Sequence, residues 1–179
     1  MKLTDGERLI IAMLCDIYKS GNVKGDIDPE FVASSILGRN EWGLKWKYPN
    51  LFLGDDDAPA VVRETCDILE MYAVLTPSFE ALSEADQARL CKTVAPFEAY
   101  VRYQGFDHDS DPHAWIVRYL VEKLGRYAEV ANPELNSASF ATLAHYRTML
   151  SRFQQIDVST LPRHQLSPGQ MIGILKPKK

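Results

Sequence analysis

Apolar residues recur along most of this chain at intervals of three and four positions, the spacing that gathers side chains on one face of an α-helix. The pattern is strongest over residues 58–75, where the charged residues fall largely on the opposite face. We predict a helix over residues 58–75 and expect Pro77 to end it, because proline lacks the N–H that a helix interior needs. A similar pattern over residues 5–20 predicts a first helix that ends at Gly21.

Helix-capping residues mark where most of the other helices should begin. A Ser, Thr or Asp at such a position accepts hydrogen bonds from the first free N–H groups of a helix, and a Glu or Gln three positions later completes a capping box. The candidate caps are Thr4, Asp28, Ser83, Asp111 and Ser167. Apolar spacing adds two further helices, over residues 96–103 and from Ser137 or Ser139 to Phe153.

Residues 39–54 lack helical periodicity, and we expect an aromatic-rich ordered loop there that can include a helical turn. No run of residues alternates between apolar and polar as a half-buried strand does. Together the patterns predict an all-α fold, a single compact domain of about eight helices. Within this domain, residues 1–179, we expect N-terminal helices with an aromatic and acidic connection over 1–57, the main helical core over 58–175 and a basic tail over 176–179.

The composition agrees with one folded core. The chain has 179 residues, of which 46% are hydrophobic and 25% charged, and its net charge is −4. These values exclude a mainly disordered chain and do not favour nucleic acid or an anionic membrane as a partner. The three cysteines are widely spaced, and no segment has the pattern of a signal peptide or a transmembrane helix. We therefore expect a cytoplasmic protein with free thiols.

The strongest candidate for a chemical site is the cluster of Asp107, His108, Asp109 and His113, because carboxylates and imidazoles at close spacing suit metal ions. The segment does not fit a calcium-binding EF-hand loop, since Pro112 stands where that loop needs glycine. No histidine precedes His108, as a phosphohydrolase with a His-Asp metal pair would require. A polar turn before the next helix explains the same residues, so a metal-assisted hydrolase or nuclease is kept only as an alternative.

Other signatures of enzymes are absent from the sequence. It has no G-x-S-x-G nucleophile motif and no glycine-rich phosphate loop, so we expect no catalytic residues and no cofactor. A second alternative is a nucleic-acid-linked regulator that uses the basic and aromatic residues of 39–48. Residues 1–50 hold seven basic and seven acidic residues, however, so this region lacks the net positive charge that phosphate binding needs.

Two short segments carry a resemblance to a known family. They are residues 64–72, ETCDILEMY, and residues 125–127, GRY. Further matching residues begin at 4–10 and end at 166–167. Together with the two segments, they make the chain resemble the YfbU family of bacterial proteins. The resemblance implies a helical domain that self-associates, that some relatives join to a helix-turn-helix domain, and that has been suspected of binding a ligand. No reaction is established for that family.

The segments that carry the resemblance also supply the candidate ligand contacts, Glu70, Tyr72, Arg126 and Tyr127. A partly buried pair of Glu70 with Arg126 would be costly unless it is well hydrogen-bonded, and it would either fix the register of two helices or line a polar pocket. We therefore expect a module without catalytic activity that forms homo-oligomers and binds an unknown small ligand or protein partner.

Overall fold

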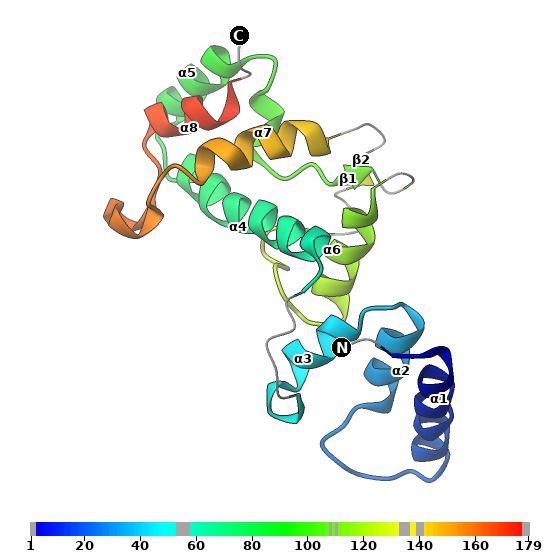
Figure 1. Cartoon of the computed structure of the whole chain (residues 1–179). Coiled ribbons are helices and arrows are strands. Elements are labelled where there is room, and N and C mark those ends of the chain that lie inside the picture. The colour runs from blue at the N-terminus through cyan, green and yellow to red at the C-terminus, as the bar shows by residue number, and fades with distance from the viewer. Residues whose placement is uncertain are drawn as a thin grey trace. The chain divides into compact units, whose positions relative to one another are not determined.

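The computed structural model describes residues 3–52, 58–107, 109, 111–132, 137–138 and 142–176 (Figure 1). The all-α prediction is confirmed, because this described part holds eight α-helices, short 3-10 turns and one pair of two-residue strands. Contacts divide the chain into two compact units, Met1–Pro59 and Ala60–Lys179. A single domain over residues 1–179 stays a prediction, and each unit is described by itself below.

The first unit contains three α-helices and a 3-10 turn: α1 (Asp5–Ser20), α2 (Pro29–Leu37), α3 (Glu41–Lys47) and η1 (Pro49–Leu51). The first two helices begin and end where their caps predict. Thr4 and Glu7 form the complete capping box of α1, and the Asp28 carboxylate accepts hydrogen bonds from the first N–H groups of α2. Local hydrogen bonds within a few residues of each start therefore fix these two helices.

Helix α3 lies where we expected a loop, so that prediction is wrong. Its two tryptophans, Trp42 and Trp46, are one helical turn apart and pack edge to face, with 4.9 Å between ring centroids. Glu41 at its start is buried and forms an ion pair with Arg8 of α1. These contacts fix a helix that is too short to show in the periodicity of the sequence.

The second unit is built around its longest helix. Its helices are α4 (Ala60–Glu80), α5 (Glu84–Val94), α6 (Pro112–Glu122), α7 (Leu143–Phe153) and α8 (Pro168–Leu175). Helix α4 contacts α6, α7 and α8, and α8 also contacts α5 and α7 (Figure 1). Ten residues of α4 are buried, including Ile68, Leu69 and Tyr72 without any exposed surface, so α4 forms the centre of this core.

Pro77 does not end α4, which continues to Glu80, so this prediction is also wrong. The turn beyond the proline is held from outside the helix. Phe79 is buried, and the buried hydroxyl of Ser78 accepts a hydrogen bond from the backbone N–H of Leu166 at 2.9 Å. Tertiary contacts on this turn offset the local cost of an interior proline.

Between the long helices the structure departs from the predicted pattern in small ways. Residues 96–103 form only a 3-10 turn, η2 (Glu98–Val101), where we expected a helix. Ser137 lies in strand β2 (Ser137–Ala138), which pairs in parallel with β1 (Phe106–Asp107), and Ser139 lies outside the described residues. Two more 3-10 turns follow α7, η3 (Val158–Thr160) and η4 (Pro162–His164).

The remaining predicted caps agree with the structure with one exception. Ser83 and Ser167 accept hydrogen bonds at the starts of α5 and α8, and Ser167 forms a full capping box with Gln170. Asp111 does precede α6, but its side chain makes no capping hydrogen bond. In the described ranges no helix is both long and apolar enough to cross a bilayer.

Candidate functional site

Three of the four predicted ligand contacts involve the outer side of α4 and the segment after α6. The hydroxyl of Tyr127 donates a hydrogen bond to the exposed Glu70 carboxylate at 3.1 Å. Burial raises the pKa of the Cys66 thiol on the same helix to about 11, while a hydrogen bond with Tyr127 and the charge of the Arg126 guanidinium act in the opposite direction. The structure thus brings Tyr127 to Glu70, in an arrangement that ties the chain after α6 to α4.

Tyr72 lies apart from the other three. Its side chain is completely buried, and its ring packs edge to face against Tyr103 and Tyr146 with 5.5 Å between centroids in each case. Its hydroxyl has a weak sulfur acceptor in Met149, at 3.9 Å. Burial raises the pKa of the Tyr72 hydroxyl well above its ordinary value, so the group stays neutral.

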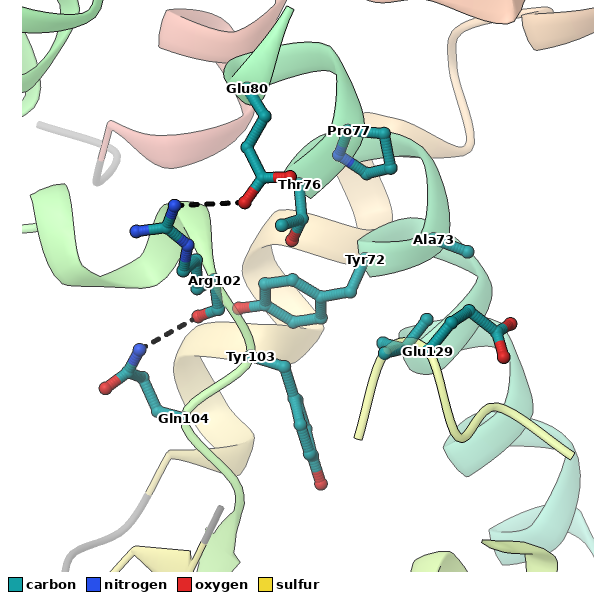
Figure 2. A pocket seen from close by; sticks show the side chains of 10 residues that line it. Tyr72, Ala73, Thr76, Pro77, Glu80, Arg102, Tyr103, Gln104 and Glu129 are labelled. Atoms are coloured by element: carbon teal, nitrogen blue, oxygen red, sulfur yellow. Dashed lines mark hydrogen bonds and ion pairs between the residues drawn. The ribbon is translucent and has the colours of Figure 1, made fainter. Parts of the chain in front are cut away.

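Tyr72 forms part of a hollow that we call the Pro77 pocket, with a volume of about 450 Å³. Figure 2 shows that three segments of the second unit meet there: α4, the chain after η2 and the chain after α6. The lining residues are Tyr72, Ala73, Thr76, Pro77, Glu80, Arg102, Tyr103, Gln104, Glu129 and Val130. The volume falls within the range of small-molecule sites in proteins, about 300–1,000 Å³.

The rim of the Pro77 pocket carries its charges. Arg102 donates to the Glu80 carboxylate at 3.0 Å, and both side chains are more than half exposed (Figure 2). Glu129 is exposed on the opposite side of the opening. Only Glu80 pairs with Arg102, and Glu129 lies apart from them, so the described lining residues together carry a formal charge of −1 at neutral pH.

The interior turn of α4 also shapes this pocket. Pro77 has no N–H, so the carbonyl group of Ala73, four residues earlier, cannot make its usual helical hydrogen bond. Both residues line the pocket. The proline thus leaves a backbone acceptor without its helical donor in a residue that lines the hollow, while tertiary contacts keep the helix continuous.

A second hollow, of about 600 Å³, lies near the starts of α4, α6 and α7 and contains a charged cluster. Arg147 donates two hydrogen bonds to the Glu64 carboxylate, at 2.6 and 2.9 Å. The buried ring of His113 lies with Nε2 2.9 Å from the same carboxylate. These partners, Arg147 above all, lower the pKa of Glu64 to about 2. We call these three residues the Glu64 cluster, and its contacts join α4, α6 and α7.

The metal alternative gains no support from this geometry. His113 points to the Glu64 cluster, Asp107 accepts a hydrogen bond from the backbone N–H of Asp109, and His108 lies outside the described residues. Within the part of the chain that the structure describes, no three His, Cys, Asp or Glu side chains gather as metal ligands would.

The region proposed for nucleic acid binding is engaged in contacts of the first unit. Lys47 lies 3.3 Å from the Asp28 carboxylate and 4.0 Å from the centre of the Phe31 ring. Asn40 accepts a hydrogen bond from the Trp42 indole N–H. Part of the basic and aromatic character of residues 39–48 therefore serves to pack α3 against α2.

Comparison with known proteins identifies the family of the chain. The family model described as the YfbU domain matches residues 1–171 of its 179. The chain belongs to the YfbU family. No curated protein and no solved structure matches this YfbU chain. The resemblance seen in the sequence is thus confirmed, and the structural description of this YfbU member rests on its own residues.

Most of the Pro77 pocket was not predicted from the sequence. Only Tyr72 was a candidate, and the acidic and basic residues of the rim come from segments far apart in the chain. One local signal did exist, because Tyr72, Leu75 and Phe79 continue the apolar spacing of α4 across Pro77. That continuity predicts that Pro77 lies inside the helix. A proline inside a helix leaves the carbonyl four residues earlier, here that of Ala73, without its helical hydrogen-bond donor.

Proposed function

We propose that this YfbU-family chain is a cytoplasmic interaction module that self-associates through α1 and has no catalytic activity of its own. The observation that carries the proposal is a row of five large apolar side chains, each more than half exposed. They are Leu9 (63%), Ile10 (58%), Met13 (57%), Leu14 (57%) and Ile17 (63%).

These five side chains share one face of α1. Their spacing of one, three and four residues places them in a single stripe, with the small residues Gly6 and Ser20 at its ends. The charged residues of the helix lie beside or behind the stripe, and Cys15, on the opposite face, is the buried residue of α1. The helix therefore presents a continuous apolar stripe without a charge in it.

The free energy available favours association. Complete burial of an aliphatic side chain contributes about 1.5–3 kcal/mol, so ten such side chains in a pair of copies, each about 60% exposed, would contribute roughly 9–18 kcal/mol. The loss of translational and rotational freedom costs about 4–15 kcal/mol. Pairing through this face is thus favourable over most of that range.

A second copy of the chain is the occupant that best fits this surface. Two α1 stripes that meet face to face would bury no charged side chain, and an uncompensated buried charge is the main cost of a mismatched interface. A two-fold axis through the contact lets each copy present the same stripe to the other and closes the assembly.

The experiment is light scattering of tag-free protein at micromolar concentrations. We expect a mass of at least twice the 20.2 kDa of the chain, and a Met13→Glu variant that runs as a monomer because it places a charge in the centre of the stripe. Leu37→Glu is the matched control, since Leu37 is 76% exposed and belongs to α2. A monomeric wild type, or an unchanged mass in Met13→Glu, would contradict the proposal.

A further inference from the structure

We propose that the Pro77 pocket binds a small organic amine in its protonated form, with the ammonium group near Glu80 and Ala73 and the apolar part against Pro77 and Val130. This inference goes beyond self-association and does not depend on it, because every lining residue belongs to the second unit. Three features of the pocket favour an amine: the charge of its opening, the balance of its donors and acceptors, and the apolar surface of its walls.

The charge of the opening favours a cation. Among the lining residues that the structure describes, Arg102 is the only basic one, and the Glu80 carboxylate lies 3.0 Å from that guanidinium. An anionic ligand would have to compete with Glu80 for Arg102 and would meet Glu129 as well. A cation instead adds a partner to the Glu80 carboxylate, where the attraction is only partly screened at short range, and Glu129 adds a weaker attraction from the other side of the opening.

The uncharged side-chain donors of Thr76 and Gln104 in the wall are used by the protein itself. The Thr76 hydroxyl donates to the carbonyl of Val101 at 3.0 Å. The side-chain amide of Gln104 donates to the carbonyls of Ala99 and Arg102, at 2.8 and 3.0 Å (Figure 2). The acceptor capacity that remains on the Thr76 oxygen and the Glu80 carboxylate suits a ligand that donates hydrogen bonds.

The backbone at Pro77 adds another acceptor. The Ala73 carbonyl lacks its helical N–H partner because residue 77 is proline. An ammonium group carries three donor hydrogens and no acceptor, so its chemistry suits a wall that offers this carbonyl and a rim carboxylate. A hydroxyl or carboxylate ligand would bring an acceptor where the wall already offers acceptors.

The walls suit an apolar body attached to the ammonium group. Pro77, Val130 and the methyl group of Ala73 supply aliphatic surface, and the rings of Tyr72 and Tyr103 form the floor (Figure 2). The volume of about 450 Å³ exceeds what an ammonium ion fills, so the inference is an amine with a hydrocarbon or aromatic part.

Three probes of similar shape test this inference on the full chain: phenethylamine, 2-phenylethanol and 3-phenylpropionate. Amide chemical shifts of isotope-labelled protein report both affinity and position. We expect phenethylamine to bind about threefold to tenfold more tightly than the neutral alcohol, the size of one partly screened charge contact, and more tightly still than the carboxylate. The shifts should centre on residues 72–80, 102–104 and 129–130.

Two substitutions on the exposed rim should change the affinity in opposite directions. Glu129→Gln should weaken phenethylamine binding about threefold, and Arg102→Gln should strengthen it by a similar factor, because each removes one charge of opposite sign. Glu70→Gln is the matched control on α4, outside the pocket lining, and should leave the affinity unchanged. A general loss of structure would weaken phenethylamine binding in both rim variants, so effects in opposite directions distinguish a change of charge from unfolding.

Several results would overturn the inference. They are a neutral or anionic probe that binds as tightly as the amine, shifts that centre elsewhere in the chain, an Arg102→Gln variant that weakens binding, and no binding of phenethylamine at millimolar concentration. The mass of the same samples, measured by light scattering, tests self-association separately. A monomer that binds the amine would contradict self-association and leave the amine site intact.

Discussion

Helices α1 and α4 have similar apolar stripes in the sequence, but they differ in what covers those stripes. In α4 the stripe is covered, and Leu69, Met71 and Leu75 have no exposed surface. In α1 the stripe is open, and the buried residue is Cys15 on the opposite face. Periodicity therefore identifies an apolar face in both helices, while the contacts of each unit decide whether that face belongs to a core or to an interface.

The experiment with the largest expected effect truncates one leucine in each helix and so tests this difference between α1 and α4. Leu69→Ala should lower the free energy of unfolding by about 3 kcal/mol because it leaves a cavity in a closed core. Leu14→Ala, in the monomeric Met13→Glu background, should cost less than about 0.5 kcal/mol, as surface changes do. Urea unfolding measures both values. If Leu69→Ala fails to fold, we expect the milder Ile68→Val to lower the free energy of unfolding by about 1 kcal/mol. Equal costs of truncation in α1 and α4 would contradict the difference between the two helices.

The Glu64 cluster should make the stability of the second unit depend on acid. The pKa of Glu64 is about 2 in the folded chain against an ordinary value of 4.5, so its contribution is complete above about pH 4.5 and is lost as the pH falls towards 2. Glu64→Gln should cost about 2 kcal/mol at pH 7 after allowance for the exposed Arg147 partner. Unfolding measured at several pH values should show the difference between the two proteins shrinking below pH 4.5, and a constant difference would contradict this role.

Removal of one cap in each unit sharpens the comparison further. Thr4→Ala and Ser167→Ala each remove the hydroxyl of a capping box, and each should cost about 1 kcal/mol. Amide hydrogen exchange should locate the effect, with faster exchange in α1 for the first variant and in α8 for the second. Faster exchange in both helices in either variant would show that the two units open together.

The smallest expected effect is the order in which the cysteines react. Cys15 and Cys66 are buried and burial raises the pKa of each thiol, in Cys66 to about 11, whereas Cys91 is half-buried. Iodoacetamide at pH 8 should therefore modify Cys91 first in the native protein. Mass spectrometry of timed digests measures the order, with urea-unfolded protein as the control, and early modification of Cys15 would indicate that the first unit opens readily.

Much of the fold could be predicted because its signals are local. The capping residues Thr4, Asp28, Ser83 and Ser167 mark the starts of their helices, since each accepts hydrogen bonds from N–H groups two or three positions away. Two of the wrong predictions, the loop expected at α3 and the helix end expected at Pro77, instead reflect contacts that are not local. Each depends on contacts with distant segments, the ion pair of Glu41 with Arg8 and the hydrogen bond from the Leu166 N–H to Ser78.

The candidate sites depended still more on contacts between distant segments. The sequence offered Glu70, Tyr72, Arg126 and Tyr127 as one group, but Tyr72 is buried with Tyr103 and Tyr146, whereas Glu70 binds the Tyr127 hydroxyl. The charged rim of the Pro77 pocket joins Glu80, Arg102 and Glu129, and the segments between them carry no motif that marks these residues.

By itself the sequence determined the helical class, most helix boundaries, the family and the faces that are apolar, because these follow from caps and spacing within a few residues. Only the tertiary structure decided that α4 continues through Pro77, that Glu64 holds Arg147 and His113, and that the stripe of α1 stays exposed. These outcomes depend on the free energy of contacts between residues that are distant in the chain, and a local pattern carries no information about which distant segment will supply the partner.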